Sequence, residues 1–250
     1  MDERGSTRYL VSVMSIQPTP IHVGPVVIGT APRVVGVISH LETVPSLLDG
    51  PNPGCDIVEM RLDQMDLSSR NWLEAARLIE AAGYPVIATL RLQEEGGGWH
   101  ESDEARRPYL ADAIAQCSCV DVELCSVLRH ELIDNAARHR KALIISHHDF
   151  QTTPSTEALT DIIERASAGP SVVVKVAVTI NQPEDIDRLR ALLRRPPTSA
   201  PLCLIGMGDA GAPARIEFPR QGSCLAYGHI DGATAPGQLS CAELSRQIKR

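Results

Sequence analysis

Short apolar runs recur along the chain, and a stretch with mixed apolar and polar positions follows most of them. The runs are rich in valine, isoleucine, leucine and alanine, as is typical of strands buried on both faces of a parallel sheet. Several of the stretches between them have the three-to-four-residue apolar spacing of amphipathic helices. The predicted strands are residues 34–38, 56–61, 85–90, 120–124, 142–146, 172–178, 202–205 and 224–227.

Helices are predicted between these strands. They cover residues 71–82, 104–115, 127–140, 155–168, 184–193 and 212–217, and a last one begins at Ser240. Asn181 is expected to cap the helix at 184–193, and Ser240 with Glu243 three residues later reads as a capping box. Eight strands alternating with helices, without a linker, predict an α/β fold of the (β/α)8 TIM-barrel type. A doubly wound open sheet is the alternative, although no G-x-G-x-x-G turn follows the first strand.

The N-terminal region precedes the alternating strands and helices. Residues 1–20 are polar, contain Pro18 and Pro20, and are expected to form a flexible leader, with residues 21–250 as one domain. The apolar run at 22–28 could add an accessory strand or hairpin. Acids occupy the positions where a signal peptide requires bases, and no segment approaches the ~20 apolar residues of a membrane span. A cytoplasmic protein without a membrane partner is therefore expected.

Composition and charge narrow the class of ligand. The formal net charge is −7 and aromatic residues make up 3% of the chain, which disfavours a nucleic-acid partner. The seven cysteines are mostly in apolar runs and are expected to be reduced thiols. Cys117, Cys119 and Cys125 lack the paired spacing of zinc ligands, so no metal site is predicted.

One charged residue interrupts the most apolar of the predicted strands. Lys175 lies in the middle of residues 172–178, and the chain contains only two other lysines, Lys141 and Lys249. Burying an unpaired ammonium group is very costly. The side chain could therefore snorkel to water at the strand end, or it could be a reactive amine in the barrel. The strand by itself leaves both interpretations open.

Other polar side chains gather near the predicted C-terminal ends of the strands, where (β/α)8 barrels carry their active sites. They are Glu59, Arg61, Arg91, Glu94, Glu95, Asp121, Glu123, His147, His148, Asp149, Arg215 and residues 234–238. Each has a structural alternative: Asp121 and Glu123 could be polar residues of the interior or paired acids at the barrel mouth. Because these side chains are expected together at one end of one barrel, an active site is favoured over separate structural roles.

These residues resemble the motifs of the type I 3-dehydroquinate dehydratases. The resemblance extends from about residue 23 to the C-terminus. The matching segments are Glu59-Met60-Arg61-Leu62-Asp63, Thr89-Leu90-Arg91 with Glu95-Gly96-Gly97, Asp121-Val122-Glu123-Leu124, Ile144-Ile145-Ser146-His147-His148-Asp149-Phe150, Val174-Lys175-Val176-Ala177 and Ala235-Pro236-Gly237-Gln238. Asp121-x-Glu123 ahead of the His-Asp segment, with the lysine 27 residues after His148, is a specific combination.

The resemblance implies a catalytic (β/α)8 domain that forms an imine between Lys175 and the C3 ketone of 3-dehydroquinate. Syn elimination of water then gives 3-dehydroshikimate, a step of the shikimate pathway and aromatic amino acid biosynthesis. The resemblance also implies a homodimer and no metal or organic cofactor. It implies His148 as the proton-transfer residue and Glu95 as the acid that orients it.

The resemblance further implies a set of substrate contacts: Glu59, Arg61, Arg91, Arg215, Thr234 and Gln238. Arg215 matches the residue that binds the substrate carboxylate, for which arginine's planar fork is well suited. Thr234 departs from the serine that is typical of its position, but it keeps the hydroxyl group, so a small effect on binding is expected.

The chemistry explains why such residues are needed. A free lysine, with a pKa of about 10.4, is almost fully protonated at pH 7, whereas an amine must be neutral to attack a ketone. Apolar walls and the arginines at 61, 91 and 215 are expected to favour the neutral form. A class I aldolase or transaldolase would share the lysine without explaining the other motifs. A regulatory barrel that only binds the metabolite is the non-enzymatic alternative, and the presence of Lys175 and His148 argues against it.

Overall fold

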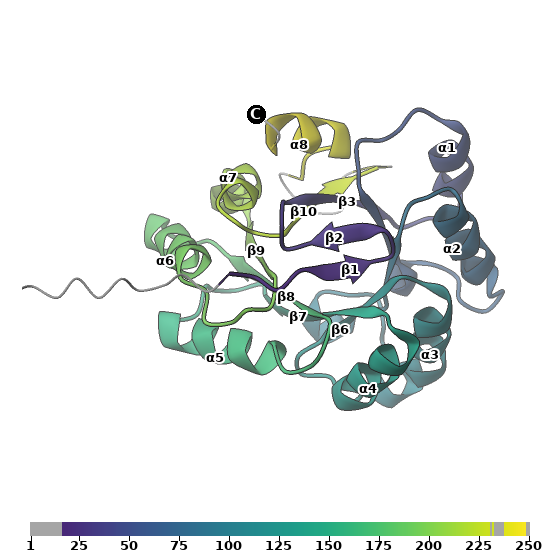
Figure 1. Ribbon diagram of the computed structural model, residues 1–250, viewed down its shortest axis with the longest axis horizontal. Coiled ribbons are helices and arrows are strands. Elements are labelled where there is room, and N and C mark those ends of the chain that lie inside the picture. The colour runs from purple at the N-terminus through teal and green to yellow at the C-terminus, as the bar shows by residue number, and fades with distance from the viewer. Residues whose placement is uncertain (1–16, 231, 233–237, 249–250) are drawn as a thin grey trace, which may run out of the picture.

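Eight parallel strands form a ring, and helices surround it (Figure 1). The computed structural model describes residues 17–230, 232 and 238–248. Neighbouring strands pair in the order β10-β3-β4-β5-β6-β7-β8-β9, which confirms the predicted (β/α)8 barrel. The strands are β3 (Arg33–Ile38), β4 (Ile57–Arg61), β5 (Val86–Thr89), β6 (Cys119–Glu123), β7 (Ala142–Asp149), β8 (Val172–Thr179), β9 (Leu202–Met207) and β10 (Leu225–His229). Cys224 N donates to Leu202 O at 2.9 Å and so connects the two ends of this order.

The helices lie on the outside of the ring (Figure 1). They are α1 (Thr43–Asp49), α2 (Asn71–Ala81), α3 (Arg107–Gln116), α4 (Arg129–His139), α5 (Thr156–Ala166), α6 (Pro183–Arg194), α7 (Ala214–Arg220) and α8 (Cys241–Ile248). Helix α1 was not predicted because it is short and contains Pro45. Among the residues that the structure describes, no helix is long and apolar enough to cross a membrane.

Two predicted helix starts have different outcomes. The capping box of α8 is confirmed, since Ser240 Oγ accepts from Glu243 N at 3.3 Å and Glu243 Oε2 accepts from Ser240 N at 3.2 Å. The predicted cap of α6 at Asn181 is wrong by one residue. Pro183 takes the first helical position, which its fixed φ suits, and Gln182 is therefore the N-cap.

An antiparallel hairpin closes the N-terminal end of the barrel. It consists of β1 (Ile21–Val23) and β2 (Val26–Ile28), which cross the middle of the ring in Figure 1 and confirm the predicted accessory hairpin. Its apolar side chains pack against the first inward-facing residues of the barrel strands, among them Val35 and Ile57. The polar residues of the sequence motifs lie toward the opposite, C-terminal end of the strands.

Side chains of β8 point alternately toward the helices and into the barrel, and this alternation sets the direction of Lys175. The even-numbered valines from 172 to 178 pack in the layer between sheet and helices, whereas Val173 packs in the barrel interior. Side chains two residues apart on a strand share a face, so Lys175 points into the interior above Val173. Apart from Lys175 and the terminal Thr179, the strand is apolar on both faces.

Candidate active site

The ammonium group of Lys175 lies inside the barrel beside two carboxylates. Its Nζ donates to Asp121 Oδ2 at 2.9 Å and lies 3.9 Å from Glu59 Oε1. The same atom lies 4.7 Å from the ring centroid of Tyr227. Lys175 is only 5% exposed, so the snorkelling interpretation is wrong. The lysine is a buried cation with buried partners.

Asp121 links Lys175 to a second cation, Arg91. Asp121 Oδ1 lies 2.9 Å from Arg91 Nη2 and accepts from Ser146 Oγ at 2.6 Å, and Ser146 Oγ in turn accepts from Arg91 Nη1 at 2.7 Å. Burial alone would raise the pKa of Asp121, but the charges of Arg91 and Lys175 outweigh it and hold the pKa well below its usual range. Asp121 is therefore ionised at neutral pH and holds the lysine in place.

The surroundings of Lys175 differ in charge from the expectation. Arg91 pairs with Asp121 and Glu123, and Arg61 pairs with Asp63 at 2.8 Å. The groups in ion-pair contact with Lys175 are the carboxylates of Asp121 and Glu59, which were not predicted from the sequence to lie beside it. Imine formation would consequently require a proton to leave a paired ammonium group.

Glu123 connects this network to a fully buried arginine. Glu123 Oε1 accepts from Leu92 N at 2.9 Å and lies 3.1 Å from Arg91 Nη1, while Oε2 accepts from Arg106 Nη1 at 2.7 Å. Arg106 also donates to Leu90 O at 2.6 Å and pairs with Asp103. Asp121 and Glu123 are thus acids of the barrel interior that both pair with Arg91, and Arg106 pairs with Glu123 in addition.

Arg106→Ala is expected to destabilise the protein by about 3–5 kcal/mol, because it leaves buried acceptors on Glu123 and Leu90 without this donor. The midpoint of urea unfolding measures the effect. Arg77→Ala is the control, since Arg77 pairs with Glu74 at the surface and its loss should leave the midpoint nearly unchanged. Equal midpoints for the two variants would contradict the structural role given to Arg106.

His148 and Glu95 form the second feature of the site. Strand β7 runs three residues beyond its predicted end, so His148 lies within it and not in a turn. His148 Nδ1 lies 2.8 Å from Glu95 Oε2, which also accepts from His148 N at 3.0 Å. An ionised carboxylate can only accept, so Nδ1 donates to it and Nε2 is left as an acceptor.

Burial shifts both members of this pair toward their neutral forms. It raises the pKa of Glu95 to about 7, with Arg91 acting in the opposite direction. Burial, together with the charges of Arg91 and Lys175, lowers the pKa of His148 well below its usual value. The imidazole is thus neutral at pH 7, and Glu95 changes between its neutral and ionised forms near that pH. When Glu95 is ionised and accepts from Nδ1, His148 can accept a proton at Nε2.

Two glycines shape the turn that carries Glu95. A Cβ on Gly96, which has φ +78°, would come 2.3 Å from Phe150 Cζ, and one on Gly97 would come 2.0 Å from Arg91 O. Phe150 in turn stacks on the His148 ring with centroids 6.3 Å apart. The Glu-Gly-Gly sequence therefore lets the turn pack against both β5 and the end of β7.

The remaining predicted site residues are Glu59, Arg215, Gln238 and Thr234. Glu59 accepts from Thr89 Oγ1 at 2.8 Å, which holds it near Lys175. Arg215 on α7 lines a small cavity with Tyr227, and burial lowers its pKa. Gln238 is half-buried. Thr234 lies outside the described residues.

Several residues of the site were missed from the sequence. Ser146, Thr89 and Tyr227 bridge or flank the charged groups. Thr89 and Ser146 lie inside the matching motif segments, but none of the three was predicted as a site residue. The two-residue period of strands could have identified them: Ser146 and Thr89 lie two residues before His148 and Arg91. Tyr227 lies two residues after the inward-facing Leu225 in the same way.

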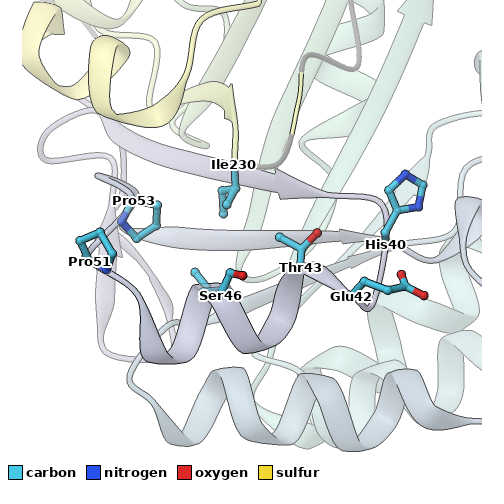
Figure 2. A pocket seen from close by; sticks show the side chains of 8 residues that line it. His40, Glu42, Thr43, Ser46, Pro51, Pro53 and Ile230 are labelled. Carbon is cyan, nitrogen blue, oxygen red and sulfur yellow. The ribbon is translucent and has the colours of Figure 1, made fainter.

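A larger cavity lies elsewhere, between α1 and the segment after β10. It has a volume of about 580 Å³, and Figure 2 shows Thr43 and Ser46 on α1 below Ile230, with His40 and Glu42 at one end and Pro51 and Pro53 at the other. Its described lining contains none of the sequence-predicted site residues. The candidate active site is defined by the buried ion network and not by this cavity.

Known proteins resemble this chain along most of its length. A family model described as type I 3-dehydroquinase matches residues 37–249. A 3-dehydroquinate dehydratase of Methanococcoides burtonii is 33% identical over 224 residues, which span 87% of this chain and 94% of the relative. One from Methanothrix thermoacetophila is 37% identical over 197 residues, spanning 78% and 82% of the two chains.

A solved structure also resembles this fold along most of its length. The crystal structure of 3-dehydroquinate dehydratase from Geobacillus kaustophilus aligns with a TM-score of 0.83 at 26% identity. The alignment covers 94% of this chain and 97% of that one. The similarity includes the barrel and extends over nearly the whole of both chains.

Proposed function

Because this chain belongs to the type I 3-dehydroquinase family, whose members are lyases, we propose that it dehydrates 3-dehydroquinate to 3-dehydroshikimate through an imine on Lys175. The family and its named relatives make it an enzyme of this class. The single observation that supports the lysine mechanism is the position of Lys175 Nζ. It lies in the barrel interior, 2.9 Å from Asp121 and in the same ion network as Arg91.

The first step is formation of the imine. Lys175 must lose a proton before its nitrogen can attack the C3 ketone, and Asp121 and Glu59 hold the side chain in position until it does. The nitrogen–carbon bond forms, the carbonyl oxygen leaves as water, and a protonated imine remains. This cation draws electrons from the neighbouring carbon and makes its proton more acidic.

The second step is elimination, for which His148 is placed by Glu95. Neutral His148 accepts the proton from the carbon next to the imine at Nε2, and the electron pair moves into an enamine. The hydroxyl group β to the imine then leaves as water by taking a proton from His148, and the enamine electrons form the new double bond. Hydrolysis of the imine releases the product and restores Lys175.

Polar groups around this pair are suited to a polyhydroxylated acid. Glu59 lies 3.9 Å from the lysine, Arg91 shares Asp121 with it, and Arg61 ends β4 in an ion pair with Asp63. These three residues are proposed to contact substrate hydroxyl groups. Arg215 is proposed to bind the carboxylate, with Thr234 and Gln238 as further contacts. No cofactor or metal is needed for these steps, because the imine itself is the electron acceptor.

An absorbance assay tests this function. Incubation with 3-dehydroquinate should produce the absorbance of a conjugated enone acid, and chemical analysis should identify 3-dehydroshikimate. A barrel that cleaves carbon–carbon bonds would release two smaller fragments, and a barrel that only binds the metabolite would release nothing. Either of these outcomes would defeat the proposal.

We also propose that the protein is cytoplasmic and that it forms a homodimer. Sedimentation velocity would test the homodimer, because it distinguishes a dimer from a monomer by mass.

Arg215→Ala is expected to raise KM roughly 10- to 100-fold with little change in kcat, because a charge-assisted contact is lost from both ground and transition states. Steady-state kinetics on 3-dehydroquinate measures this. Arg165→Ala is the control, since Arg165 pairs with Asp161 on the exposed face of α5. An unchanged KM in the Arg215 variant would mean that the carboxylate binds elsewhere.

A further inference from the structure

Cys125 stands apart from the other cysteines of this chain. The remaining six are buried, whereas Cys125 is exposed, in the turn that follows β6. Its Sγ lies 3.3 Å from Glu95 Oε1 and is directed toward it as a hydrogen-bond donor. An exposed residue thus contacts the acid that orients His148.

The two oxygens of Glu95 have different partners. Oε2 receives the backbone N–H and the imidazole Nδ1 of His148, at 3.0 and 2.8 Å. Oε1 receives the thiol of Cys125. With both oxygens engaged, the carboxylate plane is fixed between β6 and β7. The thiol is the partner on the side away from the imidazole.

The thiol acts as a donor and not as a nucleophile. Although Cys125 is exposed as a residue, partial burial of its sulfur and the neighbouring charge of Glu95 raise the pKa of the thiol to about 12, so the sulfur keeps its proton near neutral pH. A protonated thiol beside a carboxylate can donate a hydrogen bond to it. The charged or titratable groups around Glu95 are Arg91 at the end of β5, Asp121 and Glu123 on β6, and His148 on β7.

We propose that Cys125 is a positioning residue for dehydration, whose thiol holds the Glu95 carboxylate in the ionised form that keeps His148 ready to accept a proton. The proposal rests on the proposed function, in which Glu95 and His148 form the proton-transfer pair. It adds a residue from outside the family-like motifs, since Cys125 directly follows the Asp121–Leu124 segment.

The expected signature is a pH effect. If ionised Glu95 is required, kcat/KM rises with pH and reaches its plateau above the pKa of Glu95, about 7. Removing the thiol donor makes the carboxylate harder to ionise and moves this rise to higher pH. Cys125→Ala should shift it by about half a unit, a loss of roughly threefold on the acid side that disappears on the plateau.

Two further single variants and one double variant make the test specific. Cys125→Ser supplies a stronger donor at the same position and should return the rise to the wild-type pH or lower. Glu95→Gln removes the titrating group, so adding Cys125→Ala to it should cause no further shift. The measurement is the pH profile of kcat/KM for the four variants and the wild type, together with the melting temperature of each.

Three results would overturn the proposal. They are an unmoved rise in Cys125→Ala, an equal loss at every pH accompanied by a lower melting temperature, and a shift that persists in the Glu95→Gln background. Failure of the proposed function has a different signature, because the wild type would then form no enone product from 3-dehydroquinate. A wild-type enzyme with a normal profile and an unmoved Cys125→Ala profile would reject the role of the thiol alone.

Discussion

Replacing Lys175 with methionine is expected to abolish turnover, lowering kcat by a factor on the order of 10⁴ or more, because the nucleophile that forms the imine is lost. Methionine has nearly the length of lysine but neither its nitrogen nor its charge. Asp121 would keep Arg91 at 2.9 Å and Ser146 at 2.6 Å, so its buried charge would remain paired. The variant should therefore fold, which a thermal melt would show.

Lys175→Arg is the matched control for charge. It keeps a cation beside Asp121 and Glu59, but a guanidinium group stays protonated and cannot form the imine. Turnover should be lost in both variants although only one lacks the charge. Substantial activity in the arginine variant would mean that Lys175 acts through its charge and not as a nucleophile.

His148→Ala is expected to lower kcat by about 10²- to 10⁴-fold, the usual contribution of a general acid–base residue. Covalent adduct formation should continue, because the amine of Lys175 is unchanged. His147→Ala is the control: His147 is the preceding residue of β7, on the opposite face of the strand, and its replacement should leave kcat close to the wild-type value. Steady-state turnover and borohydride trapping, measured on the same samples, separate the two steps.

A different pattern would remove His148 from the proposed step. Near-wild-type turnover in His148→Ala would mean that another group transfers the proton. Loss of both turnover and adduct formation would assign the imidazole to imine formation or to the integrity of the site. The three outcomes differ in at least one of the two measurements.

The barrel could be predicted from the sequence because local pattern and global fold agree. Each strand is a run of β-branched and aliphatic residues, and the intervening helices have an apolar face. Helix α1 escaped prediction because it spans only Thr43–Asp49 and contains Pro45, which hides the periodicity. Strand β7 was predicted too short because His147, His148 and Asp149 are polar, yet they pair with β8 as far as Asp149 and Val178.

The residues of the site could be predicted, but their electrostatic pairing could not. The motifs identified Lys175, His148 and Glu95, and the strand period directs the lysine inward. The contact between Lys175 and Asp121 joins residues 54 apart, and it depends on the relative height of β6 and β8 in the barrel. Sequence spacing does not specify that height. The acidic surroundings of the lysine and the Cys125–Glu95 contact therefore emerge only from the structure.

The central claim is that Lys175 forms a covalent imine with 3-dehydroquinate. Treating the enzyme with substrate and borohydride, followed by peptide mass spectrometry, tests it most directly. The chain has only three lysines, so Lys141 and Lys249 serve as internal controls in the same sample. The account predicts a reduced adduct on Lys175 alone, which depends on the substrate and is missing from Lys175→Met. An active enzyme that yields no adduct, or an adduct on another lysine, would contradict it.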